Sequence, residues 1–151
     1  MRVTVIGFGS RDRGDDGVGI EVIERLSEGL PECAKALTCD PARLIDNLPN
    51  CGAVILVDAC LGLGEPGSVH VVNHVPEQQR STTTHGVSIS EALGLVEALG
   101  GVRLFVCVVL IEGAIFDLGQ PMSLEVSRSI PHAADIVREQ ARRMAVVSGL
   151  G

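Results

Sequence analysis

Asp16, Asp58 and His85 are the side chains of this chain whose types and positions could perform chemistry together. Two carboxylates and one imidazole form a mixed oxygen and nitrogen ligand set. Such a set suits a borderline divalent metal such as Ni²⁺ or Zn²⁺ and leaves coordination positions open. A metal held in this way can polarise a carbonyl group or activate a water molecule. The sequence therefore predicts a metal site, provided that the fold brings the three residues together.

Asp16 lies in a glycine-rich stretch, residues 7–17, that follows a predicted strand and precedes a predicted helix. Such a loop is a common ligand site in α/β proteins, so a nucleotide-binding module is one alternative. The dinucleotide fingerprint G-x-G-x-x-G, however, would need glycine where the chain has Asp12. Asp15 and Asp16 would also repel a pyrophosphate from the helix N-terminus. A simpler interpretation is that these acids cap the helix, and we favour it for Asp15.

Asp58 follows the most apolar run of the chain, residues 54–57. A charged group in such a place is costly unless it is paired, hydrogen-bonded or bound to a metal, although a hydrogen-bonded acid in a turn is an alternative. His85 lies between a polar loop, residues 76–84, and a predicted helix, and alone it would be interpreted as a solvated residue. Because loops at strand ends meet at the carboxyl edge of a sheet, we expect Asp16, Asp58 and His85 to converge in one cleft there.

Other candidate groups are weaker. His70 and His74 lie on one face of a predicted strand but too far apart to chelate one ion, so we interpret them as surface residues. Ser10 is not part of a G-x-S-x-G motif, and a serine hydrolase is therefore not expected. The cysteines contain no CxxC pair and are interpreted as buried structural thiols of a reducing compartment; they are Cys33, Cys39, Cys51, Cys60 and Cys107.

Short apolar strands alternate along the chain with amphipathic helices. Strands are predicted over residues 3–6, 36–39, 53–57, 69–72 and 104–111. Helices are predicted over residues 18–30, 41–48, 89–99 and 130–144. This alternation predicts an α/β three-layer sandwich, in which helices cover both faces of a twisted, mainly parallel sheet. The length of 151 residues fits a single domain spanning residues 1–151.

The composition excludes several classes of function. A formal charge of −7 and an aromatic content of 2% argue against nucleic-acid binding, which needs basic patches and stacking side chains. We expect the N-terminal run to be a strand rather than a signal peptide, and no apolar run approaches the ~20 residues that would span a membrane. We therefore expect a cytoplasmic protein with no membrane association and no nucleic-acid partner.

Four motifs resemble those of the hydrogenase maturation endopeptidases. The stretch GFGSRDRGDDGVG resembles the GxGN-x-(L/R)-x-DDGxG opening of that family, with Ser10 in place of its usual asparagine. VILVDAC resembles the family's central strand, TTTHGVSISEAL its histidine-bearing loop and helix, and PMSLEVSRSIPHAADIV its closing helix. The four occur in the family's order and cover nearly the whole chain.

The resemblance implies an endopeptidase that removes the C-terminal extension of a nickel-iron hydrogenase large-subunit precursor after nickel has been inserted. Its metal-binding and catalytic residues would be Asp16, Asp58 and His85, which would recognise the nickel of the substrate rather than hold a permanent ion. No organic cofactor is expected, and the precursor is the implied partner. The alternatives are a nickel-binding maturation chaperone without proteolysis and the nucleotide-binding module.

Overall fold

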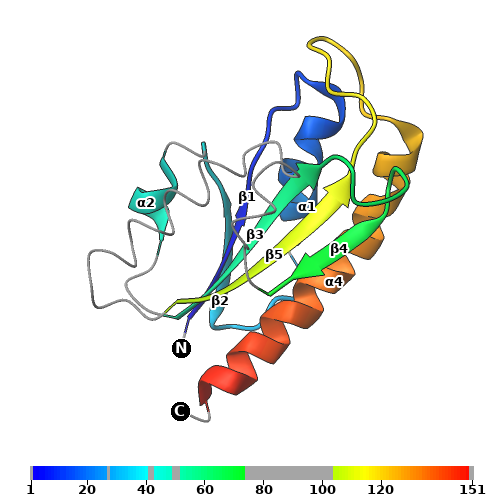
Figure 1. Ribbon diagram of the computed structural model, residues 1–151. Coiled ribbons are helices and arrows are strands. Elements are labelled where there is room, and N and C mark those ends of the chain that lie inside the picture. The colour runs from blue at the N-terminus through cyan, green and yellow to red at the C-terminus, as the bar shows by residue number, and fades with distance from the viewer. Residues whose placement is uncertain (1, 27, 41–42, 49–51, 74–103, 150–151) are drawn as a thin grey trace.

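Runs rich in valine and isoleucine form most strands of a single sheet, because β-branched side chains pack well on a pleated surface. The computed structural model describes residues 2–26, 28–40, 43–48, 52–73 and 104–149. Five strands in these residues have the spatial order β2-β1-β3-β5-β4 (Figure 1). Neighbouring strands are parallel, except that β4 runs antiparallel to β5. The strands are β1 (Val3–Gly7), β2 (Ala34–Thr38), β3 (Gly52–Cys60), β4 (Val69–Val72) and β5 (Leu104–Glu112).

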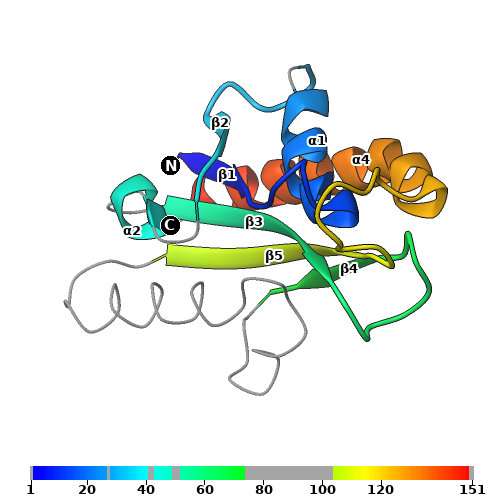
Figure 2. The same cartoon turned by 90° about the horizontal axis from the view of Figure 1, so that it is seen from above.

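Helices lie on both faces of this sheet (Figure 2). A short 3-10 helix, η1 (Gly14–Gly17), leads into α1 (Val18–Arg25), which lies beside α4 (Leu124–Gly149) on one face. The short helix α2 (Leu44–Asn47) contributes Leu44 to the core on the other face. The predicted α/β three-layer sandwich with a mainly parallel sheet is thereby confirmed.

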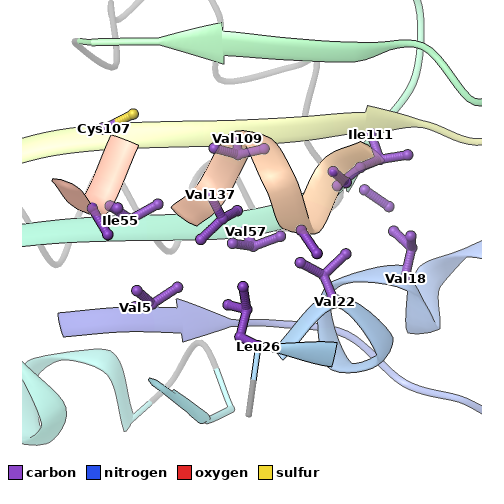
Figure 3. Packing of buried hydrophobic residues seen from close by; sticks show 14 of the residues in the cluster. Val5, Val18, Val22, Leu26, Ile55, Val57, Cys107, Val109, Ile111 and Val137 are labelled. Carbon is purple, nitrogen blue, oxygen red and sulfur yellow. The ribbon is translucent and has the colours of Figure 1, made fainter. Parts of the chain in front are cut away.

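The larger part of the core lies between the sheet and the pair α1 and α4. Figure 3 shows Val22 of α1 and Val137 of α4 directed toward Val57 of β3, and all three side chains are fully buried. Because β3 is buried on both faces, its alternate residues Val54, Leu56 and Cys60 belong to the second cluster, with Leu44 of α2. A continuous apolar run is what a parallel strand covered on both sides requires.

Several boundaries differ from the prediction by one to six residues. Helix α1 ends at Arg25 rather than near residue 30, since the Leu26 N–H already bonds to Ile23 O and Gly29 has a φ of +86°. Helix α4 begins at Leu124, six residues before the predicted 130, because the Ser123 hydroxyl accepts a bond from the Val126 N–H and so caps it. The strand predicted to end at residue 57 continues to Cys60.

The predicted loop 76–84 and helix 89–99 lie outside the described residues. No helix in the described part of the chain is both long and apolar enough to cross a membrane.

Candidate active site

The carboxyl ends of three neighbouring strands define the candidate site. β1 lies between β2 and β3, so the connection from β1 to β2 goes to one side of β1 and the connection from β2 to β3 crosses to the other; ligands bind at such a switch point in open α/β sheets. Figure 1 shows the loops that follow β1, β3 and β5 at this one end of the sheet. Asp16 lies in the first of these loops, and Asp58 lies near the end of β3.

Asp16 is almost completely buried, with 6% of its surface exposed. Its carboxylate accepts a hydrogen bond from the Ser10 N–H at 3.0 Å, which closes the loop back on itself. The loop can fold this tightly because residue 9 is glycine: its φ is +129°, and a Cβ atom there would lie 1.8 Å from the Asp16 carbonyl oxygen. Since Ser10 uses its backbone, the exchange of asparagine for serine leaves this bond intact.

Asp58 is fully buried inside β3. The expectation that it follows the strand is wrong, because pairing with β5 continues two residues further, to Cys60 opposite Glu112. The alternative of a turn acid is wrong for the same reason. Its carboxylate accepts a hydrogen bond from the Ala59 N–H at 2.8 Å. By strand alternation Asp58 lies on the face that carries Leu56 and Cys60, opposite to α1 and α4.

Close packing brings the turn of Asp16 to the end of β3. η1 contacts β3, and α1 approaches the sheet at Gly19. A Cβ atom at position 19 would lie 2.4 Å from the Phe8 carbonyl oxygen and 2.7 Å from that of Val57, so only glycine fits there. The absence of a side chain at this position lets the helix lie directly over the strand ends.

Asp15 joins two loops rather than capping its own helix, so the capping interpretation is wrong for this residue. Its carboxylate is fully buried and accepts bonds from the N–H groups of Ala114 and Ile115, at 2.8 and 2.9 Å. It also accepts bonds from the Ser123 N–H at 2.7 Å and from the Ser123 hydroxyl at 3.0 Å. Asp15 thus fixes the loop after β5 and the start of α4 against the turn that carries Asp16.

His85 lies outside the described residues, so the convergence of all three predicted ligands stays a prediction. Within the described part of the chain, no group of three or more His, Cys, Asp or Glu side chains is arranged to hold a metal ion. This part contributes the two carboxylates, Asp16 and Asp58. Their oxygen chemistry fits the oxygen part of the predicted mixed set.

The remaining candidates take structural places. His70 is half-buried, and its Nε2 lies 2.9 Å from the Ser68 hydroxyl, so it is not a free surface residue; His74 lies outside the described residues. Cys60 and Cys107 are buried free thiols, as expected, whereas Cys33 and Cys39 are only partly buried. Burial raises the pKa of the Cys107 thiol to about 11, which keeps it protonated and unreactive at neutral pH.

Glu112, a buried carboxylate at the end of β5, was not among the predicted site residues. The signal was present, because this acid ends the apolar run of residues 104–111 just as Asp58 follows residues 54–57.

Comparison with known proteins identifies the family. A family model described as hydrogenase maturation protease (HycI) matches residues 38–140, which is more than half of the chain. The chain belongs to the hydrogenase maturation protease family. The match includes Asp58 and the position of His85. The resemblance seen in the sequence motifs is therefore confirmed.

Solved structures share the fold along nearly the whole chain. The hydrogenase maturating endopeptidase HybD from E. coli has a TM-score of 0.81 at 19% identity, with 95% of this chain and 93% of that chain covered. HybD from Thermococcus kodakarensis has a TM-score of 0.79 at 24% identity, covering 93% and 99%. The hydrogenase 2 maturation peptidase from a Thaumarchaeota archaeon has a TM-score of 0.67 at 28% identity, covering 93% and 97%. Comparison with curated protein sequences gave no match.

Family membership and the site geometry both argue against the nucleotide-binding alternative. The Asp16 carboxylate occupies the Ser10 N–H, which is one of the loop amides that a phosphate would need. The first loop of this protease is thus built around its own acids rather than around a bound anion.

Proposed function

We propose that this protease removes the C-terminal extension of a nickel-iron hydrogenase large-subunit precursor, and that it does so after nickel has entered the precursor. The observation that carries the proposal is the family match over residues 38–140. The two buried acids at the carboxyl edge, Asp16 and Asp58, support it because an enzyme that inspects a bound metal needs ligands there.

The nickel is part of the substrate in this proposal. Asp16, Asp58 and His85 would approach it as two carboxylate oxygens and one imidazole nitrogen, a set that suits Ni²⁺. A divalent ion beside the scissile peptide can polarise its carbonyl group, so recognition of the metal and hydrolysis would be coupled. A precursor without nickel would offer these side chains nothing to bind and would stay uncleaved.

The proposed compartment is the cytoplasm, where a reducing environment keeps thiols free. The four cysteines in the described part of the chain form no disulfide bonds, which fits such a compartment.

The test is to mix the purified protein with nickel-loaded and nickel-free precursor and to measure the precursor's C-terminus by mass spectrometry. We expect loss of the extension only from the nickel-loaded form. His85→Ala and Asp58→Asn should abolish cleavage while circular dichroism stays native. Asp46→Asn, at an exposed position of α2, is the matched control and should cleave normally.

A nickel-binding chaperone is the second candidate, and the same experiment separates it from the protease. A chaperone would raise the nickel content of the precursor and leave its length unchanged. Cleavage of nickel-free precursor at the full rate would contradict the recognition step. Normal cleavage by His85→Ala would remove that residue from the proposed site.

A further inference from the structure

Glu112 is a buried carboxylate that the proposed mechanism does not use. It is the last residue of β5, only 4% of its surface is exposed, and it lies at the same edge of the sheet as Asp58. An ionised group in such a place is costly unless several donors compensate it.

The donors to this carboxylate all come from the end of β3 and the turn that follows it. The Gly62 N–H donates to Oε1 at 2.7 Å, and the Leu63 N–H donates to Oε2 at 3.0 Å. The Cys60 thiol, directly opposite in the strand register, donates to Oε2 at 3.3 Å. Burial alone would raise the pKa of Glu112, but these bonds, together with the electrostatic influence of nearby His70, outweigh it and lower the pKa, so the group is ionised at neutral pH.

The main chain of Glu112 holds the far end of the same loop. Its N–H donates to Ser68 O at 2.9 Å, and its carbonyl oxygen accepts from the Gly67 N–H at 2.8 Å. One residue therefore fixes both ends of the segment between β3 and β4, with its side chain at residues 60–63 and its backbone at residues 67–68.

The charge of Asp58 also acts on Cys60, the thiol that donates to Glu112. Cys60 lies two residues after Asp58 on the same face of β3 and opposite Glu112. Burial raises the pKa of the Cys60 thiol, and the bond to Glu112 and the charge of Asp58 raise it further. The Cys60 thiol thus bonds to the Glu112 carboxylate and also feels the charge of Asp58.

We propose that Glu112 is a positioning residue for the cleavage reaction: its carboxylate fixes the end of β3 and the turn after it, and thereby the carboxylate of Asp58. This inference rests on the proposed function, in which Asp58 meets the nickel site of the precursor. A small displacement of such a group lowers the rate of the chemical step far more than it weakens docking, because catalysis depends on the alignment of the reacting atoms.

Glu112→Gln tests this role because the side chain keeps its size. An amide has one oxygen, so either the Gly62 or the Leu63 N–H must face the new NH₂ group and lose its acceptor. We expect kcat for nickel-loaded precursor to fall about ten- to a hundredfold, with KM changed less than about threefold, as is typical when a group behind a site ligand is lost. The matched control is Glu65→Gln, which removes the same charge from an exposed position of the same loop and should keep both constants.

NMR can report the position of the Asp58 carboxylate without any substrate. The Ala59 N–H donates to Asp58 Oδ1, so its NMR shift reports the placement of that carboxylate. We expect the Ala59 amide to move in Glu112→Gln together with those of Gly62 and Leu63, and to stay in place in Glu65→Gln. If Glu112→Gln does not fold, Glu112→Asp keeps the charge, withdraws it by one methylene group and should give the same two effects.

A folded variant with unchanged kcat, or one in which the Gly62 and Leu63 amides move while the Ala59 amide does not, would overturn the inference and leave Glu112 as an anchor of the loop alone. A fall in stability with both kinetic constants intact would do the same. If the unmodified protein fails to cleave any precursor, the proposed function is wrong. The Ala59 shift still decides whether Glu112 positions Asp58.

Discussion

Replacing Asp15 by alanine should cost this protein a large part of its stability. Four donors lose their acceptor in this variant: the N–H and hydroxyl groups of Ser123, whose bonds are buried, and the N–H groups of Ala114 and Ile115, whose bonds are partly buried. A buried donor left unpaired costs ~1–3 kcal/mol, and a partly buried one loses only the net value of its bond, ~0.5–1.5 kcal/mol. Water entering the gap recovers some of this, so we expect a loss of about 3–5 kcal/mol in the free energy of unfolding.

The stability of Asp15→Asn should lie between that of Asp15→Ala and that of the unmodified chain. Three of the four donors meet Oδ2, and the Ser123 N–H alone meets Oδ1. The asparagine can therefore keep its oxygen at the Oδ2 position and lose one bond together with the charge, at about 1–3 kcal/mol. Asp12→Ala, at an exposed position of the same loop, is the control and should stay within about 0.5 kcal/mol of the unmodified protein.

The assay is urea unfolding followed by circular dichroism, with the slope of the transition checked for constancy across the variants. The expected order of destabilisation is Asp15→Ala, then Asp15→Asn, then Asp12→Ala. An Asp15→Ala protein within about 0.5 kcal/mol of the unmodified chain, or an asparagine variant less stable than the alanine one, would show that Asp15 does not join the loops.

Three further predictions follow from other buried positions. Gly19→Ala should lower the stability by about 1–3 kcal/mol in thermal or urea unfolding, because the added Cβ atom would meet two backbone oxygens. This loss is expected although alanine favours helices over glycine by ~1 kcal/mol. A more stable variant would contradict the close approach of α1 to the sheet. Thr4→Val should leave stability unchanged or raise it by up to about 1 kcal/mol, since the Thr4 hydroxyl is buried without a hydrogen-bond partner among the described residues, and a loss above 1 kcal/mol would reveal a partner. The lowered pKa of Glu112 means that its contribution to stability is present above the ordinary glutamate pKa of about 4.3 and is lost as the pH falls through the folded-state value. The stability difference between the unmodified protein and Glu112→Gln should therefore shrink on acidification below about pH 4, and a difference that is constant from pH 7 to pH 3 would contradict the ionised state.

The fold could be predicted from the sequence because its periodic patterns are strong. The apolar run of β3 and the helical spacing of Val18, Val22 and Leu26 follow directly from burial on one face or on both. The predicted ends of helices and strands were less accurate, since these ends depend on single contacts. α4 begins where the Ser123 hydroxyl caps it, and α1 ends before Gly29, and neither contact follows from hydrophobic periodicity.

The site could be predicted only in part. Asp16 and Asp58 are at the expected edge of the sheet, because their places follow from the order of strands and loops. The role of Asp15 could not be predicted, since its partners lie about a hundred residues away in the chain and only the tertiary structure brings them near. Glu112 was open to prediction by the argument used for Asp58, namely that a charge after an apolar strand needs compensation.

The most direct test of the central claim is the rate of precursor cleavage at a series of nickel loadings of the precursor, measured by mass spectrometry of its C-terminus with the folding of the precursor checked separately. We expect the cleaved fraction to rise in proportion to the nickel-loaded fraction. We also expect His85→Ala and Asp58→Asn to remove cleavage at every loading. Equal cleavage of nickel-free and nickel-loaded precursor would contradict recognition of the metal, and a precursor that keeps its full length at complete loading would contradict the protease itself.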